Sequence, residues 1–121
     1  MPLEKSITDS IIAYIKQIGG QAEKVKGTAI SSGRPDINAC YNGRCLRIEV
    51  KTPDNKNKAS KKQKLNLRRW KKSGAIVIVA YSKQSVVRLL DCYIHGQTGM
   101  LKYIEPNGCM SKAFIPQVEE V

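Results

Sequence analysis

The stretch GRPDINACYNGRCLRIEVK, Gly33–Lys51, places a two-residue turn signal between two short apolar segments. Its centre, Asn42-Gly43, is the dipeptide best suited to a type I′ hairpin turn, because both positions of that turn need positive φ. The flanking residues alternate between apolar and polar, as in strands that bury one face. The stretch therefore predicts an antiparallel hairpin with arms Ile37–Tyr41 and Arg44–Thr52.

The register that this turn sets brings two carboxylates together. Asp36 faces Glu49, and alternation along the second arm puts Lys51 on the same side of the sheet. Counting from the turn, the two carboxylates form a non-hydrogen-bonded pair with Cβ atoms roughly 5 Å apart. Such a like-charge pair is destabilising unless a shared proton or a divalent cation lies between the carboxyl groups. The alternative is an ordinary half-exposed strand in which Glu49 pairs with Lys51 or Arg47; the spacing from Pro35-Asp36 favours a metal site.

Periodicity outlines the rest of the chain. Ile7, Ile11, Ile15 and Ile18 recur at helical spacing, which predicts a first helix that begins between Leu3 and Ile7 and ends at Gly19-Gly20. Further expected elements are a weak strand within Ala22–Ser31, a helix from Ser60 to about Ser73, a strand over Ala75–Tyr81, a helix capped by Ser82, and two short strands near Met100–Ile104 and Lys112–Ile115.

The order helix, three strands, helix, strand, helix predicts an α/β fold with a mixed central sheet flanked by helices. AIVIVAY, Ala75–Tyr81, is a continuous, β-branched apolar run, typical of a strand buried on both faces. The crossover from the second hairpin arm to this strand predicts a parallel pair. We expect a domain over residues 1–95, with 96–121 as an extension of the same domain and a candidate dimer surface.

Composition narrows the class of partner. The chain has 121 residues, enough for one domain, and 21 Lys+Arg against 10 Asp+Glu give a net charge of +11. Such an excess of positive charge favours a polyanionic partner, and nucleic acid is the first candidate. No long apolar run or signal pattern is present, so we expect a cytoplasmic protein. The four cysteines and single histidine lack zinc-site spacing, and any metal should have oxygen ligands.

The motif set resembles a known nuclease family. Pro35-Asp36 followed by Glu49-Val50-Lys51 resembles the PD-(D/E)xK superfamily. The segments SSGRPDI, RIEVKTP and SKKQKLNLRRWKKSGAIVIVA, in that order, are similar to the VRR-NUC family of virus-type replication-repair nucleases. The resemblance covers about Glu4 to Ser85 and implies a restriction-endonuclease-like core.

The resemblance also implies roles for individual residues. Asp36, Glu49 and the backbone carbonyl of Val50 would bind the catalytic metal, Mg²⁺ or Mn²⁺ in its place, and Lys51 would serve the attacking water. Glu4, in the first helix, would support the metal or its waters.

Gln63 has two interpretations. Ser60-Lys61-Lys62-Gln63 is a capping-box pattern, in which Gln63 bonds back to the Ser60 backbone. The family carries a glutamine of the second helix at its active site, and this resemblance favours the site over the cap.

The second helix and the loop before it form a basic surface. We expect it to contact DNA phosphates, although a solvated helix face has the same pattern. Trp70 is a candidate for core or dimer surface, Phe114 is a candidate for dimer surface, and His95 has no expected role. The expected DNA-binding residues are Lys56, Lys58, Lys61, Lys62, Lys64, Arg68 and Lys71.

The resemblance implies a magnesium-dependent DNA endonuclease that leaves a 5′-phosphate. Stand-alone members of the family are homodimers that cleave Holliday junctions, which implies a homodimer acting on branched DNA, in a bacterial host if a phage encodes it. The alternatives are a non-catalytic nucleic-acid-binding protein on a nuclease fold and a restriction-type enzyme that reads a base sequence.

Overall fold

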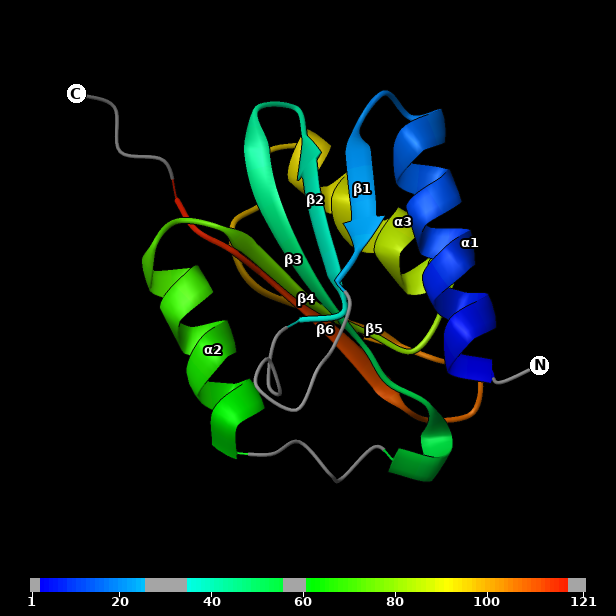
Figure 1. The fold of residues 1–121 in the computed structure, drawn as a ribbon. Helices are drawn as coiled ribbons and strands as arrows, with labels where there is room; N and C mark the ends of the chain where they lie inside the picture. Colours follow the sequence, from blue (N-terminus) through cyan, green and yellow to red (C-terminus); the bar gives the residue numbers. More distant parts are fainter. Residues whose placement is uncertain (1–2, 26–34, 56–60, 118–121) are drawn as a thin grey trace.

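The structure is a computed structural model, which describes residues 3–25, 35–55 and 61–117. Within these ranges the chain forms a mixed sheet and three α-helices (Figure 1). The elements are α1 (Leu3–Gln17), β1 (Gln21–Lys24), β2 (Ile37–Tyr41), β3 (Arg44–Val50), the 3₁₀ helix η2 (Pro53–Asn55), α2 (Lys61–Lys72), β4 (Ile76–Ala80), α3 (Lys83–Ile94), β5 (Gly99–Ile104) and β6 (Met110–Ile115).

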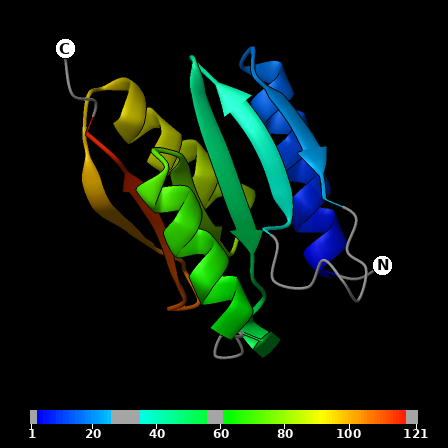
Figure 2. The same cartoon turned by 60° about the vertical axis from the view of Figure 1, so that its left-hand side comes forward.

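The sheet has the strand order β1-β2-β3-β4-β6-β5, in which only β3 and β4 run parallel. Helices α1 and α3 cover one face, while α2 lies on the other (Figure 2). The predicted α/β class, the mixed sheet and the parallel crossover through α2 are confirmed.

The hairpin has the predicted turn and register. Asn42 and Gly43 have φ values of 53° and 75°, as a type I′ turn requires. The ladder runs from Tyr41–Arg44 to Ile37–Ile48, so Asp36 lies one step beyond it, opposite Glu49. This carboxylate pair is of the non-hydrogen-bonded kind, because the Val25 N–H donates to the Asp36 carbonyl oxygen at 2.8 Å, which turns that carbonyl towards β1 and away from β3.

The apolar core lies between the sheet and the α1/α3 layer. Ile11 and Ile15, two of the isoleucines that recur at helical spacing in α1, are fully buried in this core. Burying one such side chain contributes roughly 1.5–3 kcal/mol. β4 is buried along most of its length between β3 and β6, as its apolar run predicts. The remaining large side chains of this core include Ile37, Leu46, Ile48, Ile76, Ile78, Val86 and Leu90.

Helix α2 is held differently. None of its residues is buried, and α2 makes most of its contacts with the sheet through β4. Two stacked pairs fasten it: the Arg47 guanidinium lies 3.9 Å from the centre of the Trp70 ring, and Lys71 Nζ lies 4.0 Å from that of Phe114. The face of the sheet under α2 is therefore covered only in part.

Several boundaries differ from the sequence expectations. The strand expected within Ala22–Ser31 is β1, which ends at Lys24, and residues 26–34 lie outside the described ranges. The second hairpin arm ends at Val50 instead of Thr52. The Lys51 N–H instead donates to the Ala80 carbonyl oxygen at the end of β4. The two short C-terminal strands are confirmed as β5 and β6, which complete the sheet.

The caps of α3 are also as expected. The hydroxyl oxygen of Ser82 accepts from the Ser85 N–H at 3.0 Å. No helix in the described ranges is both long and apolar enough to cross a membrane.

Candidate active site

Two carboxylates meet where the β2–β3 hairpin ends. Asp36 precedes β2 and is half-buried, whereas Glu49 in β3 is only 4% exposed. Asp36 Oδ2 accepts from the backbone N–H of Val50 at 2.7 Å, which fixes that carboxyl group against β3. The hairpin register thus brings a half-buried and a buried carboxyl group together from two separate positions in the sequence.

Burial shapes the titration of this pair. It raises the pKa of Glu49 to about 8, with a further rise from the negative charge of Asp36 and an opposing effect of Lys51. Burial also raises the pKa of Asp36, against the Val50 N–H, a hydrogen bond with Glu49 and the charge of Lys51, which lower it. In the absence of a cation the pair therefore holds a proton at neutral pH, which is one of the two ways to neutralise facing carboxylates.

Lys51 lies on the same side of the sheet as the pair. It is 7% exposed, and its charge acts on both Asp36 and Glu49. A buried ammonium group next to two carboxylates can hold a phosphate oxygen or a water molecule in place.

Gln63 connects α2 to the carboxylate pair. Its Nε2 donates to Glu49 Oε1 at 3.0 Å. The side chain therefore reaches the candidate site, while Ser60, its partner in the capping-box interpretation, lies outside the described residues.

Glu4 approaches from the opposite layer. It is half-buried in the first turn of α1, and its charge contributes to the raised pKa of Glu49. Asp36, Glu49, Lys51 and Gln63 therefore lie on one side of the sheet, while Glu4 acts on Glu49 through its charge.

The donor set fits a hard cation. Glu49 Oε2 is buried and has no hydrogen-bond partner among the described residues, so it is an oxygen that lacks a donor. Within those residues no group of three or more His, Cys, Asp or Glu side chains forms a ready-made metal cage. Mg²⁺ needs only one or two carboxylates and completes its shell with waters and phosphate oxygens, so Asp36, Glu49 and a backbone carbonyl suit it better than Zn²⁺.

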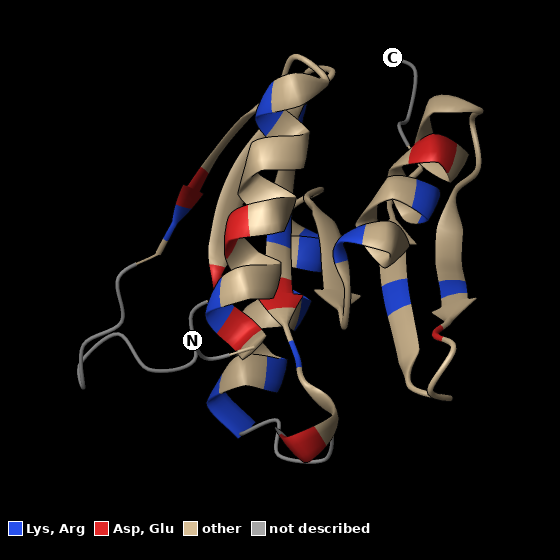
Figure 3. Cartoon of the chain, turned by 90° about the vertical axis from the view of Figure 1, so that its right-hand side faces the viewer, with Lys and Arg blue, Asp and Glu red and all other residues tan. Residues whose placement is uncertain are grey.

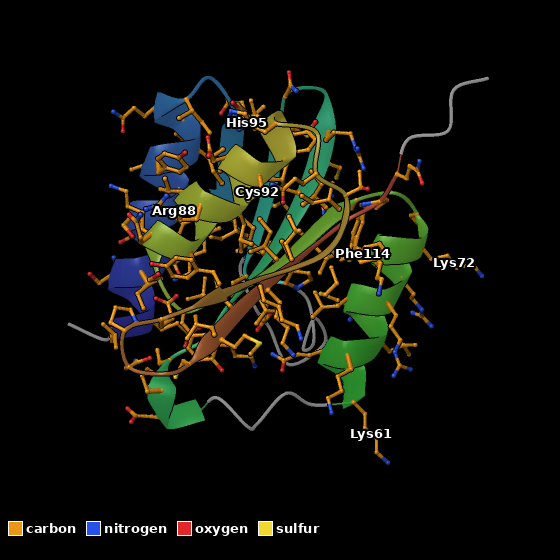
Figure 4. The ribbon with its side chains drawn as sticks, turned by 180° about the vertical axis from the view of Figure 1, so that it is seen from behind. Lys61, Lys72, Arg88, Cys92, His95 and Phe114 are labelled. Carbon is orange, nitrogen blue, oxygen red and sulfur yellow. The ribbon has the colours of Figure 1, made fainter. Side chains whose placement is uncertain are left out.

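The expected DNA-binding residues line α2. Lys61, Lys62, Lys64 and Arg68 are exposed, and Lys61 and Lys72 project outward at the two ends of the helix (Figure 4). Lys71 is half-buried over Phe114. Lys56 and Lys58 lie outside the described residues.

Arg47 has a role that the sequence did not reveal. It stacks on Trp70 instead of pairing with Glu49, and so joins β3 to α2 beside the carboxylates. A contact between distant elements leaves no local pattern in the sequence. His95 is the exposed C-cap residue of α3 (Figure 4), and its Nδ1 is 2.8 Å from the Asp91 carbonyl oxygen.

Fold and site together define a nuclease-type α/β domain with a buried carboxylate pair. No protein-family model and no curated protein matches the sequence. A solved structure described as a VRR_NUC domain is similar over 77% of this chain and 99% of its own, with a TM-score of 0.64 and 25% sequence identity. This likeness, together with the motif set, supports membership of the VRR-NUC family, as the sequence predicts.

Proposed function

We propose that the protein is a magnesium-dependent DNA endonuclease that hydrolyses phosphodiester bonds in branched DNA, such as a Holliday junction, and acts as a homodimer. One observation carries the proposal: the buried Asp36–Glu49 pair, with Glu49 Oε2 unpartnered among the described residues, lies beside Lys51 in a VRR_NUC fold.

Asp36, Glu49 and the Val50 carbonyl would hold Mg²⁺, or Mn²⁺ in its place. Bound there, the ion supplies Lewis-acid stabilisation of charge on the phosphate and lowers the pKa of a bound water. Lys51 aligns the attacking water with the phosphorus, opposite the leaving 3′-oxygen, so that the product carries a 5′-phosphate. Gln63 keeps the Glu49 carboxyl oriented through its hydrogen bond, and Glu4 supports the waters of the site.

The basic surface of α2 would position the DNA. Lys61, Lys62, Lys64, Arg68 and Lys71, with Lys56 and Lys58 before them, contact phosphates and not base edges. A four-way junction is two-fold symmetric, and a C₂ dimer matches it with two copies of one site.

The test is cleavage of labelled junction and linear DNA by the wild type and by Asp36→Ala, Glu49→Ala and Lys51→Ala, with and without Mg²⁺. Each variant should lose cleavage, by about 10²-fold or more, while DNA affinity changes little because the basic surface is intact. Full magnesium-dependent activity in Glu49→Ala would contradict the assignment.

The same assay separates the alternatives. A binding protein on a nuclease fold would cut neither substrate under any condition. A restriction-type enzyme would cut linear duplex at one base sequence and ignore branching.

A further inference from the structure

The β5–β6 hairpin presents an unusual surface on the side of the sheet where α2 lies. Every second residue of β5 and of β6 points to this side of the sheet, and each such residue of β5 lies directly opposite one of β6. Met100 and Ile104 are exposed by 51% and 67%, although large apolar side chains are normally covered. The cross-strand pairs of this hairpin face are Met100–Phe114, Lys102–Lys112 and Ile104–Met110.

Its central pair consists of two like charges. The Glu105 N–H donates to the Cys109 carbonyl oxygen, so that Lys102–Lys112, three pairs further along the ladder, is of the non-hydrogen-bonded kind. Cβ atoms in such a pair are about 4.5–5.5 Å apart, and directly opposed like charges are destabilising. Neither lysine forms an ion pair with a described residue, and the two are direct partners on the adjacent strands β5 and β6. Figure 3 shows the basic residues of the sheet and helices in blue.

A groove joins this hairpin face to α2. It has a volume of about 460 Å³ and an apolar floor that includes Val77, Val79 and Met100. Phe114 lies between the strand β6 and α2 (Figure 4), with Lys71 over its ring. The lining contains no acidic residue, and its cations are Lys64, Arg68, Lys71 and Lys112.

The groove is continuous with the carboxylate site. Val79 is aligned with Glu49 across β3–β4 and with Lys112 across β4–β6. These three residues therefore form a row on one side of the sheet. Two strand spacings separate Lys112 from Glu49, which is about 10 Å.

We infer that this groove binds a single-stranded nucleic-acid segment next to the cleavage site. Unstacked bases lie against Met100 and against the side of the Phe114 ring that Lys71 does not cover, and phosphates lie between Lys102, Lys112 and the cations of α2. The inference rests on the proposed nuclease function and adds to it the path of the strand. An apolar, aromatic floor is of use to splayed bases, whereas a duplex keeps its bases stacked inside and presents only its backbone and groove edges.

Charge favours this occupant over a second copy of the chain. A two-fold contact through the hairpin face would oppose the same patch on both copies. It would bring two Lys102–Lys112 pairs together without an acidic residue from the groove lining to neutralise them. A polyanion would neutralise the positive charge of the lysine pair, whereas a second copy of the chain would double that charge.

The test measures binding of a fluorescent oligothymidylate by anisotropy in EDTA. Lys102→Gln/Lys112→Gln should weaken binding by about tenfold or more, whereas Lys16→Gln/Arg88→Gln, the same charge change on exposed residues of α1 and α3, should change it less than about twofold. Phe114→Leu should also lose about tenfold and Phe114→Tyr should retain wild-type affinity, because stacking of one base is worth roughly 1–3 kcal/mol by substitution. Equal losses in the two lysine pairs, or an unchanged affinity in Phe114→Leu, would overturn the groove as the binding site.

Two further measurements complete the design. Melting curves establish that each variant is folded, and light scattering establishes its mass. If Lys102→Gln/Lys112→Gln changes the oligomeric state and leaves oligonucleotide affinity untouched, the hairpin face is an interface between copies and the inference is wrong. Because binding is measured without metal, these results do not depend on cleavage, which Glu49→Ala tests separately.

Discussion

Glu49 shows how burial turns an ordinary residue type into a candidate ligand. Its carboxyl group is almost fully buried, receives one hydrogen bond from Gln63, and keeps Oε2 without a partner among the described residues. A buried charge of this kind costs stability unless it is protonated or paired. In the metal-free protein the proton is retained, and a divalent cation at the pair would displace it.

The raised pKa of Glu49 predicts a pH-dependent stability in the absence of metal. The folded state holds the proton up to about pH 8, whereas the unfolded chain releases it near 4.5. The folded state thus binds more protons between these values, and the free energy of unfolding falls as pH rises, by at most about 1.4 kcal/mol per pH unit. The raised pKa of Asp36 acts in the same direction, and Lys51 limits both effects.

Chemical denaturation in EDTA at acidic, neutral and alkaline pH checks this expectation. Glu49→Gln should remove most of the slope and should be the more stable protein at pH 8. Mg²⁺ should stabilise the wild type more at alkaline than at acidic pH, because it competes with the proton. Parallel curves for wild type and Glu49→Gln would show that Glu49 is not the titrating group.

Gln63 allows an isosteric test of its contact with Glu49. Gln63→Glu would set a third carboxylate against the pair and should slow cleavage by about tenfold or more, with little change in melting temperature. A residue that only capped the helix would tolerate the change, since glutamate serves a capping box equally well. Gln17→Glu, the same amide-to-acid change at the exposed C-terminal end of α1, is the control. An unchanged rate in Gln63→Glu would remove it from the active site.

At the scale of elements, α2 is the least securely held part of the site. It supplies Gln63 but has no buried residue, and the contacts that hold it include the Arg47–Trp70 and Lys71–Phe114 stacks and the Gln63–Glu49 hydrogen bond. Cation–π contacts contribute about 0.5–2 kcal/mol each. The attachment of α2 is therefore weak enough for a single substitution to loosen it.

Trp70→Ala should loosen α2 by about 1–2 kcal/mol and increase hydrogen exchange in that helix more than in β4. Cleavage should fall with it, because Gln63 loses its place beside Glu49. Trp70→Phe keeps an aromatic face for Arg47 and should retain most of the protection. Uniform exchange changes across the whole sheet would instead identify Trp70 as a core residue.

The hairpin register can be checked through two cysteines. Cys40 and Cys45 are cross-strand partners, and both are free thiols in the structure. A Cβ at Gly20 would lie 2.7 Å from the Cys40 carbonyl oxygen, so this carbonyl points to the β1 side and the cysteine pair is non-hydrogen-bonded. Its Cα separation of about 4.5 Å is within the disulfide range.

Excess oxidised glutathione should therefore join Cys40 to Cys45 in the folded protein, which peptide mass spectrometry would detect. Cys40→Ser should abolish that cross-link. Because Asp36–Glu49 is two non-hydrogen-bonded pairs further along the same ladder, the cross-link also tests the register that brings the carboxylates together. A cross-link that joins Cys40 or Cys45 to Cys92 or Cys109 instead would contradict it.

Local patterns explain which parts of the molecule could be predicted. The Asn42-Gly43 turn fixes its own register, and the apolar run of β4 reports its burial. Pairings between distant segments leave no such pattern: β6 lies between β4 and β5, and this order aligns Lys112 with both Val79 and Lys102. The Arg47–Trp70 stack could not be predicted from the sequence for the same reason. The carboxylate pair could be predicted from the sequence because a local turn sets its register. The groove could not be predicted, since it depends on the order of strands that are distant in the sequence.

The whole molecule leads to a prediction about assembly. The described residues of one 121-residue chain hold one carboxylate pair and one basic groove, which under the proposed function would cut one strand, whereas resolving a four-way junction requires paired cuts in opposing strands. We therefore expect a homodimer of twice the 13.5 kDa chain mass that binds branched DNA more tightly than linear duplex of equal length. Affinity for both should fall steeply with salt, because phosphate contacts release counterions. Light scattering at micromolar concentration, paired with a junction-cleavage gel, measures both properties. A monomer that cuts linear duplex as readily as a junction would exclude junction resolution and leave the nuclease assignment standing, since Asp36 and Glu49 come from the same chain.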